Sequence, residues 1–136
     1  MLTNVLWDAQ LHYPANAFPT MLDWIQTTIK FFISKPNLEL IIRVHPAEKS
    51  GTLPSRQLVE DEISKEFKDL PKNIKIIGPD HPANTYKLAK RCNAALIFGT
   101  KTGVELTSMG IPPIVAGEAW IRGKGLTNDA TSPESY

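Results

Sequence analysis

Length, composition and charge place the chain among ordinary globular domains. Its 136 residues suit one domain, 42% of them are hydrophobic and 21% charged, and 15 basic against 14 acidic residues leave a net charge of +1. This balance disfavours a nucleic-acid-binding surface, and the single cysteine, Cys92, excludes an internal disulfide and a multi-cysteine zinc site.

The sequence contains no segment that suggests membrane insertion or secretion. No apolar run approaches the roughly 20 residues that span a bilayer. The first residues, MLTNVLWDAQ, carry an acid and no basic start, which is unlike a signal peptide. We therefore expect a soluble cytoplasmic domain, and the sequence leaves open a parent protein that associates peripherally with the inner face of the cytoplasmic membrane.

The first half of the chain alternates apolar runs with helical periodicity. A short apolar run over residues 4–7 ends at Asp8. After a loop, Thr20 can cap the first helix. The next run (LELIIRV) is nearly continuous and β-branched, as in a strand buried on both faces. It is followed by a loop (AEKSGTLP) and by a second helix, which we expect Ser55 to cap. We predict strands over residues 4–7 and 38–44, and helices over residues 22–35 and 55–70.

The second half repeats the alternation with shorter elements. We predict strands over residues 73–77, 94–98 and 113–116, and helices over residues 85–92 and 102–109. In the tail, Ser132, Pro133 and Glu134 resemble the first turn of a further helix. A chain that stops there has the pattern of a fragment of a longer protein.

This alternation predicts an α/β fold in which a parallel sheet of about five strands is covered by helices on both faces. Ligands of such sheets bind beyond the carboxyl ends of the strands. The unusual residues fall at these ends: Asp8, His45-Pro46, His81-Pro82, residues 99–103 and the segment from Gly117 onward. The tripeptide His-Pro-Ala occurs at both His45 and His81, a repetition that we interpret as chance.

The segment Gly99-Thr100-Lys101-Thr102-Gly103 lies between a predicted strand and a predicted helix. Its glycines would allow close approach of a ligand, and its hydroxyls, its lysine and the helix start would attract an anion. The alternative is an ordinary turn in which a threonine caps the helix, and the spacing alone does not separate the two. Glu105 follows in the first helical turn, where it suits either the helix dipole or the two hydroxyls of a ribose.

A second candidate segment, His45-Pro46-Ala47-Glu48, follows the most apolar strand, with Arg43 two residues earlier. A histidine at a strand terminus can donate to phosphate or transfer a proton, although many histidines are structural. No pair of histidines has the spacing of metal ligands, so we expect no metal site.

A third candidate is the basic loop of Arg122, Lys124 and Gly125, which could close on a phosphate or be a solvated surface turn. No Ser-His-Asp or Cys-His set can be assembled from the spacing, so hydrolysis by a protein nucleophile is not supported. The catalytic residues therefore stay unassigned.

Three segments together resemble the C-terminal half of capsule polysaccharide biosynthesis proteins. They are IIRVHPAE, the stretch NTYKLAKRCNAALIFGTKTGVELTSMGIPPIVAGEAW, and RGKGLTND. That group is similar to the bacterial Kdo transferases and belongs with the GT-B glycosyltransferases. The resemblance covers most of the chain. It implies a Rossmann-like three-layer sandwich that forms one of two domains facing a cleft and binds the nucleotide-sugar donor.

The resemblance also implies roles for individual residues. His45 and Pro46 would contact the donor phosphate, Thr100, Thr102 and Gly103 would lie at that phosphate, and Glu105 would lie near the ribose. Arg122, Lys124 and Gly125 match a later basic segment of the family. The donor would be a CMP-activated sugar bound without metal or cofactor. A polysaccharide or glycolipid acceptor would bind through an N-terminal half that this sequence lacks, so we expect the isolated domain to be inactive.

Two other functions stay open at this stage. One is a nucleotide-sugar epimerase of similar architecture, and the other is a non-catalytic α/β module that binds a nucleotide or a protein. The sequence also leaves open a dimer formed through the surface that a missing half would cover.

Overall fold

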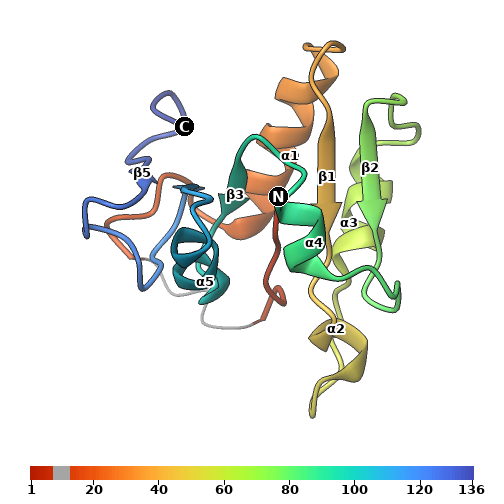
Figure 1. Ribbon diagram of the computed structural model, residues 1–136. Helices are drawn as coiled ribbons and strands as arrows, with labels where there is room; N and C mark the ends of the chain where they lie inside the picture. Colours follow the sequence, from red (N-terminus) through yellow and green to blue (C-terminus); the bar gives the residue numbers. More distant parts are fainter. Residues whose placement is uncertain (8–12) are drawn as a thin grey trace.

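A computed structural model describes residues 1–7 and 13–136 as a mixed α/β fold with parallel strands (Figure 1). The first sheet pairs β1 (Leu40–Arg43) with β2 (Ile74–Ile77), and the second runs in the order β3 (Ala95–Ile97), β4 (Pro113–Val115), β5 (Asn128–Asp129). The expected parallel strands are thus present, but among the described residues they pair in two small sheets rather than clearly in one sheet of about five strands.

The N-terminal segment lies between the two sheets (Figure 1). Leu2 forms isolated parallel bridges with Arg43 of β1 and with Ile97 of β3. Its N–H donates to the carbonyl of Leu96 at 2.9 Å, and the N–H of Thr3 donates to the carbonyl of Arg43 at 3.2 Å. The strand predicted over residues 4–7 is wrong, because the backbone pairing occurs nearer the start and ends before Trp7, which lies in a turn.

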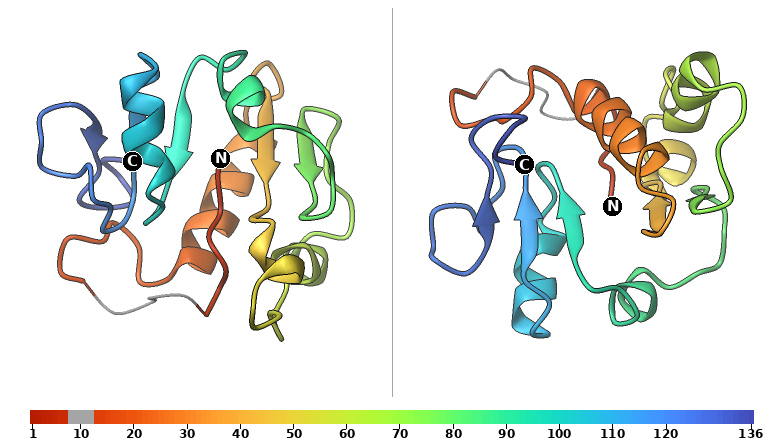
Figure 2. Two further views of the ribbon diagram at one scale, coloured as in Figure 1. Left: turned by 60° about the horizontal axis from the view of Figure 1, so that its bottom comes forward. Right: turned by 90° about the horizontal axis from the view of Figure 1, so that it is seen from above.

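Helices lie on both sides of the strands (Figure 2, right). On one side are α1 (Met21–Ile33), which contacts β2, and α3 (Val59–Glu66), which contacts α1. On the other side are α4 (Thr85–Ala89) and α5 (Thr102–Ser108), the second of which contacts β4. The short helix α2 (Ala47–Ser50) lies in the segment that we predicted to be a loop.

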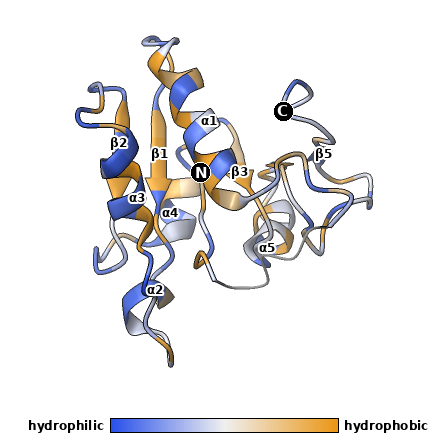
Figure 3. Ribbon diagram, turned by 180° about the vertical axis from the view of Figure 1, so that it is seen from behind, coloured by the Kyte–Doolittle hydropathy of each residue, from blue (hydrophilic) through white to orange (hydrophobic). Residues whose placement is uncertain are grey.

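The main core forms between α1 and the strands. Trp24, Ile25 and Ile29 of α1 are fully buried against Ile42 and the neighbouring apolar residues. Figure 3 shows β1 as a largely apolar strand, whereas α1 and α3 carry hydrophilic turns as well. Burial of these apolar side chains is the main force that holds the helices to the strands.

One of the two predicted helix caps is confirmed and the other is wrong. Thr20 caps α1 as predicted, because its Oγ1 accepts the N–H of Asp23 at 3.1 Å. Ser55 does not cap α3: its hydroxyl accepts the indole N–H of Trp7 at 3.1 Å, and the helix begins later, at Val59, after Leu58.

The tail also differs from the prediction. Ser132, Pro133 and Glu134 lie in a turn rather than a helix, and the Ser135 hydroxyl accepts the N–H groups of Thr131 and Ser132 at 2.9 and 3.0 Å. The short strand β5 was not predicted. Among the described residues, no helix is both long and apolar enough to cross a membrane.

Candidate functional site

A cavity of about 480 Å³ opens beside the carboxyl ends of β1 and β3. Four stretches of chain meet there: the N-terminal segment, the residues after β1, the loop from β2 into α4, and the start of α5. The lining residues are Leu2, Thr3, Arg43, Val44, His45, Pro46, Pro79, His81, Pro82, Ala83, Asn84, Thr85, Tyr86, Thr100 and Thr102. None of these residues is acidic.

Both His-Pro-Ala segments border this cavity, and their histidine rings make the same backbone contact. The Nδ1 atom of His45 accepts the backbone N–H of Ala47 at 3.1 Å, and the Nδ1 atom of His81 accepts the N–H of Ala83, also at 3.1 Å. In a neutral ring that accepts through Nδ1, the proton is on Nε2. Each turn therefore favours a histidine whose Nε2 is a donor. The repetition that we interpreted as chance thus places two histidines with the same ring contact on one cavity.

Arg43 brings a positive charge beneath the cavity. Its side chain is buried, with 7% of its surface exposed, and its guanidinium donates to the carbonyls of Gly78 and, at 3.3 Å, His81. Its Nε is buried without a hydrogen-bond partner, and no carboxylate of residues 1–7 or 13–136 forms an ion pair with it. Because an arginine stays charged, the cavity is electrostatically suited to an anion.

Thr100 and Thr102 contribute hydroxyls to the cavity. Thr100 is buried, and its Oγ1 accepts the backbone N–H of Thr102 at 3.3 Å and donates to the Thr102 hydroxyl at 3.2 Å. Lys101, which lies between them, does not line the cavity. Its Nζ is 4.5 Å from the ring centroid of Trp120, which gives its ammonium group a cation–π contact.

The two glycines of this segment lie where an added Cβ would come close to neighbouring atoms. A Cβ at Gly103 would lie 2.6 Å from Cδ1 of Ile97 and 3.1 Å from Cγ2 of Ile121. A Cβ at Gly99 would lie 3.1 Å from the carbonyl oxygen of Glu118. Close contact between α5 and the strands therefore explains Gly103 without a ligand.

Glu105 lies next to the cavity rather than on its wall. The hydroxyl of Tyr86, which does line the cavity, donates to Oε2 of Glu105 at 2.7 Å. This hydrogen bond raises the pKa of Tyr86 above its usual value. Both side chains are exposed, so a ligand in the cavity could reach the carboxylate past the tyrosine ring.

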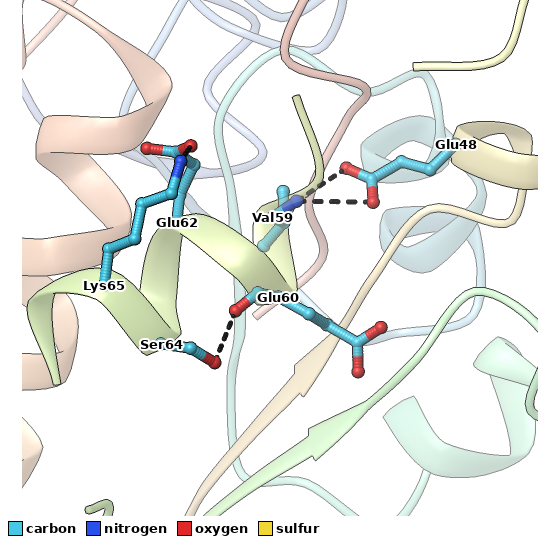
Figure 4. A network of polar contacts seen from close by, with 6 residues as sticks. All are labelled: Glu48, Val59, Glu60, Glu62, Ser64 and Lys65. Carbon is cyan, nitrogen blue, oxygen red and sulfur yellow. Dashed lines mark hydrogen bonds and ion pairs between the residues drawn. The ribbon is translucent and has the colours of Figure 1, made fainter. Parts of the chain in front are cut away.

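Glu48 is turned away from the cavity and binds the start of α3 (Figure 4). Its carboxylate oxygens accept the N–H of Val59 at 3.2 and 3.4 Å. The side chain is 1% exposed, and burial raises its pKa from 4.5 to about 7, helped by the nearby Glu60 and Asp61 carboxylates. Glu48 is therefore explained as a cap at the start of α3.

The basic loop after β4 is also separate from the cavity. The guanidinium of Arg122 donates to the carbonyls of Val115 at 3.4 Å, Gly117 at 3.3 Å and Ala130 at 2.7 Å, so it links the ends of β4 and β5. Lys124 and Gly125 are exposed in the same loop and do not line the cavity.

The structure therefore brings together five of the predicted site residues: Arg43, His45, Pro46, Thr100 and Thr102. The sequence analysis noted His81-Pro82 at a strand end without giving it a role, and it missed the following residues, from Ala83 to Tyr86, as a wall of the site. Asp8 lies outside the described residues. Within them, no group of three or more His, Cys, Asp or Glu side chains could hold a metal ion.

Parallel strands joined through helices, with a basic and hydroxyl-lined cavity at their carboxyl ends, define an α/β protein with a candidate anion site. The model of the family described as capsule polysaccharide biosynthesis protein matches residues 3–135. The chain therefore belongs to this family, which indicates a role in surface polysaccharide synthesis. Searches among curated proteins and among solved structures found no match.

Proposed function

We propose that this chain is the nucleotide-sugar-binding domain of a glycosyltransferase in capsule or surface polysaccharide biosynthesis. In this proposal the domain is the Rossmann-like donor half of a GT-B architecture, and its donor is a CMP-activated sugar. The acceptor, a polysaccharide or glycolipid, binds through a further domain of the parent protein. Membership of the capsule family and the position of the cavity at the strand ends support the proposal.

The observation that carries the proposal is the buried guanidinium of Arg43, which donates to two backbone carbonyls but has no carboxylate partner among residues 1–7 and 13–136. A buried charge is costly unless an opposite charge or hydrogen-bond acceptors compensate it, and the described lining of the cavity contains no carboxylate. A phosphate in the cavity would supply the missing negative charge. His45 and the hydroxyls of Thr100 and Thr102 are the groups that we propose as its hydrogen-bond donors.

These residues also suit the chemistry of the transfer. When the bond between the sugar and the phosphate breaks, negative charge increases on the phosphate oxygen that leaves. Donors that are already fixed in place, as His45 is by its turn, stabilise that charge without reorganisation. We assign Glu105 to the two ribose hydroxyls, with Tyr86 orienting its carboxylate through their hydrogen bond. No residue of this chain is assigned as catalytic acid or base.

Isothermal titration with CMP, UMP, UDP and ADP tests the proposal. We expect CMP to bind in the millimolar range, about −4 kcal/mol, because one domain supplies half of a cleft. His45→Asn keeps the acceptor for Ala47 but shortens the donor, and it should weaken CMP binding about tenfold, or roughly 1.4 kcal/mol. Glu105→Ala should weaken it as well, whereas the control Lys124→Ala, in the loop remote from the cavity, should not.

The outcomes separate the parts of the proposal. Tighter binding of UDP than of CMP, with the same response to His45→Asn, would keep the site and overturn the CMP assignment. Binding that is unaffected by His45→Asn, or no binding of any of the four nucleotides, would contradict the proposed site.

A further inference from the structure

The cavity contains a second histidine whose ring makes the same backbone contact as that of His45, and no role has been given to it so far. His81 follows β2 as His45 follows β1, and β1 and β2 are paired with Arg43 opposite Ile77. In both turns the ring accepts the N–H of the alanine two residues later, at 3.1 Å. Within residues 1–7 and 13–136, the His81 ring makes no other hydrogen bond.

Arg43 connects the two turns. It lies two residues before His45 in β1, and its guanidinium donates to the carbonyls of Gly78 and His81. The N–H of His81 also donates to the carbonyl of Gly78 at 3.2 Å. The Gly78 carbonyl thus accepts from both the guanidinium and the backbone of His81. The backbone of His81 is therefore fixed relative to β1 by a side chain that is itself buried.

We propose that His81 is a second phosphate-binding residue of the nucleotide site, and that Arg43 is the positioning residue that holds it beside His45. The inference rests on the proposed function, since the ligand is the phosphate of the same nucleotide. A phosphate monoester has several free oxygens, so donors from two turns can bind it at once. The exposed His81 ring is accessible to such a ligand, and its Nδ1 contact favours the Nε2 donor.

A purely structural role for His81 makes a different prediction, because the turn needs only an acceptor at the position of Nδ1. Asparagine supplies that acceptor and can form the same turn, but it has no donor at the distance of Nε2. Glutamine has its amide nitrogen at about that distance. His81→Asn and His81→Gln therefore separate the turn from the ligand contact.

The experiment measures the dissociation constants of CMP and of cytidine by NMR titration for the wild type and for both variants. In the wild type, the phosphate should make CMP the tighter ligand. In His81→Asn we expect CMP to bind about tenfold more weakly while cytidine is unchanged, so that the preference for CMP falls. His81→Gln should bind CMP more tightly than His81→Asn does. The NMR spectra of the free proteins also show whether each variant is folded.

Three results would overturn the inference. If His81→Asn binds CMP like the wild type while His45→Asn is weakened, His81 is structural and the proposed function stands. Should both His81 variants lose CMP and cytidine to the same extent, the residue acts through the fold and not through the phosphate. A wild type that binds neither CMP nor cytidine would instead refute the proposed CMP site, and this inference with it.

Discussion

Replacing Glu48 by glutamine removes an ionisable group from the interior and keeps an acceptor for the N–H of Val59. The folded-state pKa of Glu48 is raised from 4.5 to about 7, chiefly by burial. The folded protein therefore binds more protons than the unfolded chain between these two pH values. Its free energy of unfolding must fall as the pH rises through this window, because the stabilising contribution is complete below the unfolded pKa.

The size of the effect follows from the shift. Each pKa unit corresponds to about 1.36 kcal/mol, so a change from 4.5 to about 7 gives a loss of about 3 kcal/mol between pH 4 and pH 8. Glu48→Gln has no such ionisation. We expect the stability of Glu48→Gln relative to the wild type to rise by about this amount over the same range, while the contributions of the other groups cancel.

Urea denaturation followed by circular dichroism, at half-unit steps of pH, measures this difference. Glu62→Gln is the matched control in the same helix, because the pKa of Glu62 is lowered, chiefly by its hydrogen bond to Lys65 at 2.6 Å. Its substitution should change the pH dependence in the opposite direction. A stability difference between Glu48→Gln and the wild type that does not vary with pH would refute the reasoning.

Substitutions at three further positions test the packing and the caps by denaturant unfolding. Gly103→Ala should destabilise by about 1–3 kcal/mol despite its better helix propensity, because the new Cβ would collide with Ile97; an unchanged or higher stability would show that this contact relaxes. Asn73→Ala should cost about 1–3 kcal/mol, since its Nδ2 donates to the carbonyl of Phe32, in the last turn of α1, at 2.9 Å and to that of Leu38, beyond the helix, at 2.8 Å; a loss below 0.5 kcal/mol would contradict that role. Thr20→Ala should cost about 1 kcal/mol, whereas Thr20→Ser, which keeps the capping hydroxyl, should cost little.

Local signals in the sequence were sufficient for most of the elements. The β-branched run that contains β1 and the capping hydroxyl of Thr20 act over a few residues, so both could be predicted. The pairing of the N-terminal segment and the start of α3 could not be predicted, because both depend on partners that are distant in the sequence. Leu2 pairs with β1 and β3 across the whole domain, and Ser55 is engaged by the indole of Trp7.

The same distinction applies to the candidate site. Residues that directly follow strands, such as His45 and Thr100, could be assigned to it from the order of elements alone. Glu48 and Arg122 have the residue types of a binding site, yet their partners are a helix start and three backbone carbonyls. Those contacts are set by tertiary packing, which composition and spacing do not encode. His81 was noted at a strand end and in a repeated tripeptide, but neither signal assigned it a role.

The most direct test of the central claim is to map where CMP binds. In a titration of the ¹⁵N-labelled domain, we predict that the largest amide shifts fall on residues 45–47, 78–86 and 100–102, around the cavity that contains Arg43, while the loop of residues 122–125 changes little. Shifts that cluster instead on residues 122–125, with the two His-Pro-Ala turns unaffected, would contradict the account.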